Sequence, residues 1–171
     1  MSETYSIVIK HDAFTFRAKH AVICQTESGV VMEPVHEHEF HFTVTITGPL
    51  DQNGWVVDFE QIIHCCTDLA VELEGKILIP GLNPGLQIHE ENGTISTRFS
   101  DKIESFSASI TKILPYSNTT TEFIACWMIR NLVKTLEKKK ILAYPNNRYR
   151  FKITLEEAAG CFVEYCFEND D

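Results

Sequence analysis

The chain has 171 residues, of which 44% are hydrophobic and 23% are charged, and this composition is typical of one soluble globular domain over residues 1–171. Its 24 acidic residues outnumber its 15 basic residues, so the formal net charge of −9 disfavours binding to a nucleic-acid backbone. No segment approaches the roughly 18 consecutive apolar residues of a membrane span, and the opening residues lack the pattern of a signal peptide. We therefore expect a cytoplasmic protein with no nucleic-acid or membrane partner.

Two segments in the first third of the chain alternate apolar and polar residues, which is the period of a half-buried β-strand. In residues 5–20, one face carries Phe14, Phe16, Ala18 and His20. In residues 36–47, one face carries His36, His38, Phe40, Phe42, Val44 and Ile46. Antiparallel pairing places Arg17 and Lys19 close to the glutamates at positions 37 and 39, which favours this register. The intervening residues 22–34 are predicted to form a long loop.

The middle of the chain predicts a helix followed by a hairpin. Residues 51–54 form a predicted turn, Trp55-Val56-Val57 a short strand, and Asp58 the N-cap of the helix. The apolar stripe of this helix consists of Phe59, Ile62, Ile63, Cys66, Leu69 and Leu73. Further on, Asn92-Gly93 predicts a hairpin turn between residues 86–88 and 94–96. Residues 103–114 alternate again and predict another strand.

The last third of the chain predicts a second helix and two strands. Thr119 and Glu122 have the spacing of a capping box, so the helix is expected to begin at Thr119. Its apolar residues are Phe123, Trp127, Leu132, Val133 and Leu136. Two strands, residues 149–157 and 161–167, are expected to follow, joined by a turn at residues 158–160.

Three histidines have the spacing of a metal site. His36 and His38 lie two residues apart on one face of a strand, about 7 Å from each other along the chain. His20 has the parity that places it over the same face once the two strands pair. Three imidazoles with a vacant fourth position are typical of a catalytic zinc ion. The alternative is that an H-x-H pair in a strand binds no metal.

Four segments, taken in order, resemble the signature segments of the 6-pyruvoyl-tetrahydropterin and 6-carboxy-tetrahydropterin synthase family, of which the chain is a divergent member. They are residues 14–20, the pair His36-x-His38, residues 54–59 and residues 120–125. The resemblance implies an α+β tunnelling fold, in which two long hairpins form an antiparallel sheet with two helices on one face. Residues from about 84 to 118 then form an inserted hairpin region that varies in the family. The resemblance also implies zinc on His20, His36 and His38, and a homohexamer with active sites between subunits.

The resemblance further implies a carboxylate that binds the pterin ring through paired N–H bonds. Glu157 has the expected spacing from Tyr165, and Glu156 is the competing assignment. Thr120 and Glu122 match the threonine and glutamate of the family's second helix. The alternative is that this threonine and glutamate only cap the helix, and that a carboxylate at a strand end is only solvated.

The chain departs from the family pattern at two catalytic positions. Met32 occupies the place of the cysteine base, and a thioether cannot accept a proton. Glu33 and His36 instead have the E-x-x-H form of a variant group in which a glutamate replaces the cysteine, so Glu33 is the candidate base. Glu74 and Gly75 occupy the place of the family's aspartate and proton-relaying histidine.

Glycine has no side chain that can carry a proton, so a proton relay in place of Gly75 must come from another residue. His64, His89 or an adjacent subunit can supply it, although exposed positions without a catalytic role are the favoured interpretation of His64, His89 and His11.

Three functions are consistent with these residues. The first is a zinc-dependent pterin lyase that acts on the side chain of a dihydroneopterin or its triphosphate, with Glu33 as base. The second is a catalytically inactive module that binds zinc and a pterin or purine, which the residues Met32 and Gly75 favour. The third is a zinc hydrolase for an unrelated small molecule.

Overall fold

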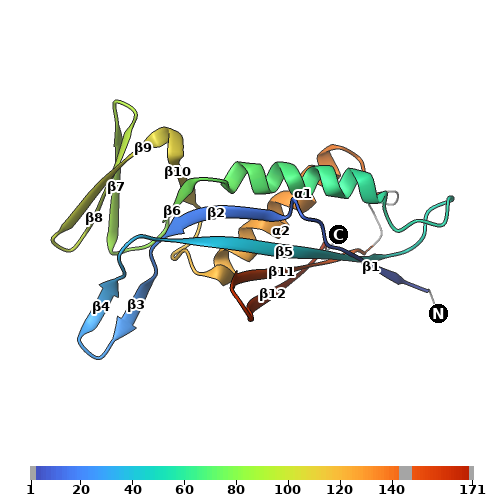
Figure 1. Cartoon of the computed structure of the whole chain (residues 1–171), viewed down its shortest axis with the longest axis horizontal. Coiled ribbons are helices and arrows are strands. Elements are labelled where there is room, and N and C mark those ends of the chain that lie inside the picture. Colours follow the sequence, from blue (N-terminus) through green and yellow to red (C-terminus); the bar gives the residue numbers. More distant parts are fainter. Residues whose placement is uncertain (1–2, 143–147, 170–171) are drawn as a thin grey trace.

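A mixed sheet built around one long strand organises the chain (Figure 1). The computed structural model describes residues 3–142 and 148–169. The sheet consists of β1 (Tyr5–Ile9), β2 (Thr15–His20), β5 (His36–Gly48), β6 (Lys76–Pro80), β10 (Thr111–Leu114), β11 (Arg150–Ala158) and β12 (Cys161–Glu168). Its order is β10-β6-β2-β5-β11-β12, and β1 also pairs with β5. The pairs among β1, β2, β5, β11 and β12 are antiparallel as predicted, whereas β6 runs parallel to β2 and β10.

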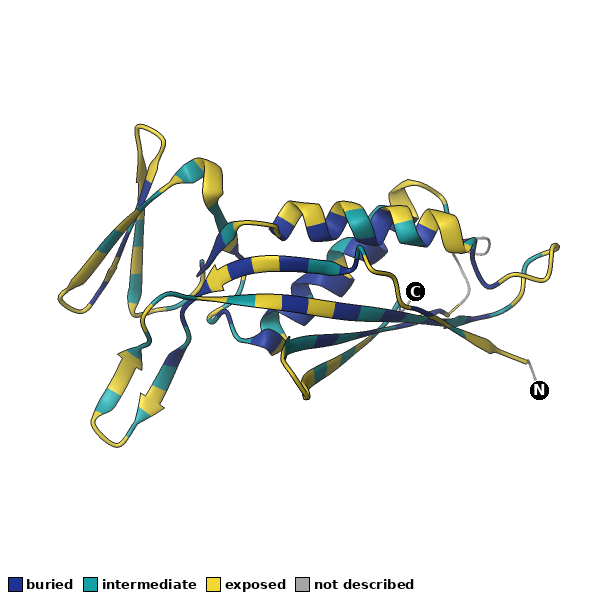
Figure 2. Cartoon of the chain, in the orientation of Figure 1, coloured by how far each residue is buried: buried dark blue, intermediate teal, exposed yellow. Residues whose placement is uncertain are grey.

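Two helices, α1 (Phe59–Leu73) and α2 (Thr121–Lys138), pack on one face of this sheet (Figures 1 and 2). Each helix is amphipathic and places its apolar stripe against the buried face of the strands. Within this core the rings of Phe16 and Phe40 stack with centroids 5.0 Å apart. The α+β arrangement predicted from the sequence is therefore confirmed.

The register of β2 against β5 is the one that charge and polarity predict. Arg17 lies opposite Glu39, and Lys19 lies opposite Glu37. His20 lies directly opposite His36. Because side chains alternate between the two faces of a strand, this register places both histidines and His38 on the same face.

Several local predictions are wrong, two of them before the first helix. Trp55-Val56-Val57 is not a strand, because the Asp51 carboxylate accepts hydrogen bonds from the amides of Asn53 and Trp55 and closes a turn there. Residues 22–34 are not an irregular loop, because they contain the hairpin of β3 (Ile23–Thr26) and β4 (Gly29–Met32).

Residues 86–107 form a small sheet of their own, at the upper left of Figure 1. Its three antiparallel strands are β7 (Leu86–Glu91), β8 (Thr94–Phe99) and β9 (Lys102–Ser107). The turn at Asn92-Gly93 is confirmed, and both residues have the positive φ that a type I′ turn requires. The predicted strand over residues 103–114 is instead interrupted by a 3₁₀ turn, Ala108–Ile110, which separates β9 from β10.

Within the described residues 3–142 and 148–169, no helix is long and apolar enough to cross a membrane.

Candidate metal centre

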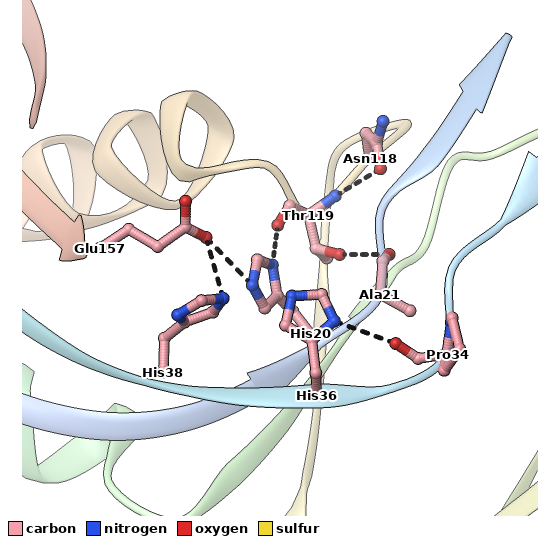
Figure 3. Close-up of polar contacts among 8 residues, drawn as sticks. All are labelled: His20, Ala21, Pro34, His36, His38, Asn118, Thr119 and Glu157. Atoms are coloured by element: carbon pink, nitrogen blue, oxygen red, sulfur yellow. Dashed lines mark hydrogen bonds and ion pairs between the residues drawn. The ribbon is translucent and has the colours of Figure 1, made fainter. Parts of the chain in front are cut away.

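Three imidazoles converge where β2 and β5 pair (Figure 3). His20, His36 and His38 each offer one nitrogen, and these atoms all lie within 4.8 Å of one another. The ring centroid of His20 lies 4.7 Å from that of His36 and 5.3 Å from that of His38. The structure therefore brings together the three residues that strand parity selected.

The His20 ring is oriented by the segment that precedes α2. Its Nδ1 lies 2.6 Å from the carbonyl oxygen of Thr119, and because a carbonyl only accepts, Nδ1 carries the proton. The side chain is 1% exposed. Burial lowers the pKa of the His20 imidazole, against the raising effects of the Thr119 carbonyl and the Glu157 carboxylate. A neutral ring with a proton on Nδ1 presents the lone pair of Nε2 to the other histidines.

His36 is oriented in the same manner. Its Nδ1 donates to the carbonyl oxygen of Pro34 at 2.9 Å, which leaves Nε2 as the free ligand atom. A backbone carbonyl on the far nitrogen is the usual device that fixes the tautomer of a metal-binding histidine.

Glu157 completes the cluster from β11. Its Oε1 lies 3.1 Å from Nε2 of His20 and 3.8 Å from Nε2 of His38. Within the described part of the chain, the buried Nε2 of His20 has no partner in hydrogen-bonding geometry. A lone pair and a carboxylate oxygen that face each other repel unless a cation lies between them. Nitrogen and oxygen donors in this number suit zinc, so the residues present fit that ion.

Glu156, the competing assignment, has another role. Its carboxylate accepts a hydrogen bond from the amide of Gly160 at 3.0 Å, within the turn that joins β11 to β12. The β11–β12 register shifts between Glu156 and Ala158, and the irregularity falls at Glu157.

The sequence alone did not assign two residues, Asn118 and Thr119, to this site. The Thr119 hydroxyl donates to the carbonyl oxygen of Ala21 at 3.0 Å, and the Asn118 amide group bonds both the amide nitrogen and the carbonyl oxygen of Ile23. These contacts fix the chain directly after His20. The predicted capping box is wrong, because Thr120 is the N-cap residue and the Thr119 hydroxyl is used on Ala21. The sequence signal that could have indicated Asn118 and Thr119 is the run of short polar residues at positions 117–119, directly before a helix.

A cavity of about 320 Å³ adjoins the histidine cluster through Glu157. It is lined by Val22, Thr120, Thr121, Glu122, Glu157, Cys161, Phe162 and Val163. The side chain of Thr120 makes no capping hydrogen bond. The three residues predicted to bind substrate, Thr120, Glu122 and Glu157, therefore border one space.

The predicted catalytic carboxylates lie in different surroundings. The amide of Glu33 donates to the carbonyl oxygen of Val22 at 2.9 Å, and Val22 lines the cavity, whereas Glu33 is not among the residues that line it. Glu74 is bound to Arg17, whose amide donates to its Oε2 at 2.8 Å. Gly75, with a φ of 69°, donates its amide to the carbonyl oxygen of Arg17. Within one chain, Glu74 thus contacts the outer face of β2 rather than the histidines.

The two histidines considered as proton carriers, His64 on α1 and His89 on β7, are exposed, and so is His11 in the segment after β1.

The model of the 6-pyruvoyl tetrahydropterin synthase family matches residues 9–166, which include every residue of this cluster. The chain belongs to this family. The family predicted from four short segments is thereby confirmed. Membership in the 6-pyruvoyl tetrahydropterin synthase family supports a lyase of pterin metabolism as the class of activity.

Individual members of the family are distant in sequence but close in structure. A 6-carboxy-5,6,7,8-tetrahydropterin synthase candidate from Methanocaldococcus jannaschii is 22% identical over 161 residues, which cover 91% of this chain and 93% of that protein. The 6-pyruvoyl tetrahydropterin synthase of Plasmodium vivax has a TM-score of 0.85 at 16% identity, over 98% of this chain and 100% of the other. The Plasmodium falciparum enzyme has a TM-score of 0.80 at 16% identity, over 96% and 98% of the two chains. The likeness confirms the predicted tunnelling fold.

Proposed function

We propose that this protein is a zinc-dependent lyase that cleaves the side chain of a dihydroneopterin or its triphosphate. The observation that carries the proposal is the convergence of His20, His36 and His38 beside the Glu157 carboxylate and a cavity. Membership in the 6-pyruvoyl tetrahydropterin synthase family supplies the pterin chemistry.

The ring and the side chain of the substrate are handled by different residues. Glu157 accepts paired hydrogen bonds from the N–H groups of the aminopyrimidine edge, and Thr120 and Glu122 border the same cavity. A zinc ion held by the three histidines would supply a Lewis acid for an oxygen of the side chain. Binding of the ring by Glu157 would orient the side chain of the substrate toward these histidines.

Glu33 is the proposed base. Cleavage of a carbon–carbon bond beside a hydroxyl group requires a group that takes the hydroxyl proton, and a carboxylate can do so where the thioether of Met32 cannot. Met32 instead lines a small apolar cavity together with Val35 and Phe106. In the Plasmodium vivax enzyme, the residue replaced by cysteine or alanine in two solved variants is a glutamate described as catalytic, which supports a catalytic glutamate in this protein. With dihydroneopterin, the bond between the first and second side-chain carbons breaks and the deprotonated hydroxyl becomes the carbonyl of the released glycolaldehyde. The ring-side carbon takes up a proton and gives 6-hydroxymethyl-dihydropterin.

The proposed assembly is a cytoplasmic homohexamer with active sites between subunits. Glu74 is bound to Arg17 within its own chain. A catalytic role of Glu74 therefore requires a site that an adjacent subunit completes.

A second candidate function is an inactive module that binds zinc and a pterin or purine. It is favoured by Gly75, which has no side chain that can transfer a proton. The φ of 69° at this position disfavours most other residues.

Incubation with 7,8-dihydroneopterin and with its triphosphate, followed by separation of the fluorescent pterins, tests the proposal. A new pterin with a shortened side chain is expected with at least one substrate and not in a buffer blank. Binding of both pterins with no new product, unchanged by Glu33→Gln, would instead support the inactive module.

A further inference from the structure

The contacts of Glu157 differ from those of a carboxylate that serves only to bind a ring. Its Oε1 lies 3.1 Å from Nε2 of His20. The same oxygen lies 3.8 Å from Nε2 of His38 (Figure 3). One oxygen atom therefore faces two of the nitrogen atoms that the metal centre would use.

Within residues 3–142 and 148–169, no other protein donor holds this carboxylate. Among the described residues, its polar contacts are with the two imidazoles, whereas the neighbouring Glu156 is fixed by the amide of Gly160. Glu157 and His38 are 28% and 29% exposed, while His20 is 1% exposed and held by Thr119. The carboxylate is thus on the more exposed side of the cluster, between the histidines and the cavity.

We propose that Glu157 is a fourth protein ligand of the metal, which closes the coordination sphere while the cavity holds no pterin. The inference rests on the zinc centre of the proposed function. Three imidazoles and one carboxylate fill the four positions of tetrahedral zinc, whereas a catalytic site needs one of these positions open. A pterin ring that offers N–H groups to Glu157 draws the carboxylate toward the cavity and opens the fourth position. Ring binding and access to the metal are thereby coupled through one side chain.

Metal binding without turnover tests this role. Zinc affinity is measured by competition with a chromophoric chelator for the wild type, Glu157→Gln and the control Glu156→Gln, which removes the same charge one residue away. Loss of a ligand at a preformed site should weaken zinc binding by at least about tenfold in Glu157→Gln. Glu156→Gln should match the wild type, and circular dichroism should show that all three proteins are folded.

Cobalt-substituted protein reports whether the fourth position is open. Azide should change the visible spectrum of cobalt-loaded Glu157→Gln at concentrations that leave the wild-type spectrum unchanged, because only the variant has an open position. The second variant, Glu157→Asp, keeps the negative charge but shortens the side chain by one methylene group. It should bind azide as Glu157→Gln does. It therefore also tests the inference if the glutamine variant does not fold.

The outcomes separate this inference from the proposed function. Azide binding to the wild type as readily as to the variants, or unchanged zinc affinity in Glu157→Gln, overturns the role of Glu157 and leaves the histidine site intact. A wild-type protein that binds neither zinc nor cobalt overturns the inference together with the metal centre.

Discussion

Replacing His36 with alanine is expected to reduce bound zinc from about one ion per chain to a trace, and to abolish lyase activity. The variant keeps only two imidazoles, and the orienting bond from Nδ1 to the Pro34 carbonyl is lost with the ring. His36 is only partly buried, so the sheet should fold without it. The metal content is measured by mass spectrometry of the dialysed protein, and folding by circular dichroism.

His41→Ala is the matched control for this variant. His41 lies on the same strand, β5, but its parity places it on the opposite face, where it is exposed. Its zinc content should equal that of the wild type. Retention of one zinc ion by His36→Ala would show that the ion is bound elsewhere.

Glu33→Gln is expected to lower turnover by a factor of about 10² to 10⁴, the usual contribution of a general base. Glutamine has nearly the same size but cannot accept the substrate proton, so zinc content and pterin binding should remain close to those of the wild type. Steady-state rates with dihydroneopterin and equilibrium binding of the oxidised analogue neopterin measure the two properties separately.

The control for this variant is Glu37→Gln. Glu37 is exposed on the outer face of β5 opposite Lys19, and its replacement should leave the rate unchanged. If Glu33→Gln turns over as fast as Glu37→Gln, the base is another group.

Most of the sheet and the three histidines could be predicted because local patterns determine them. Alternation in β2 and β5 assigns each side chain to a face, and the opposite charges of Arg17 and Glu39 fix the register. Once that register is known, the positions of His20 and His36 across from each other follow directly. The N-cap at Asp58 is equally local, since its carboxylate accepts from the amide of Glu60.

Other features depend on contacts that no local pattern contains. Thr119 meets His20 across 99 residues of sequence, and its hydroxyl reaches Ala21 in place of the helix terminus. The proximity of Glu157 to the imidazoles depends on the irregularity between Glu156 and Ala158 in β11. The β3–β4 hairpin was missed because its turn at residues 27–28 lacks a strong hairpin dipeptide, and the positive φ of Gly29 becomes evident only in the structure.

The most direct test of the metal centre is anomalous diffraction at the zinc absorption edge from crystals of the protein purified without added chelator. We expect one peak per chain, between the Nε2 atoms of His20 and His36 and within bonding distance of His38. A peak at any other position, or rings of the three histidines with no peak between them in crystals supplied with zinc, would contradict it.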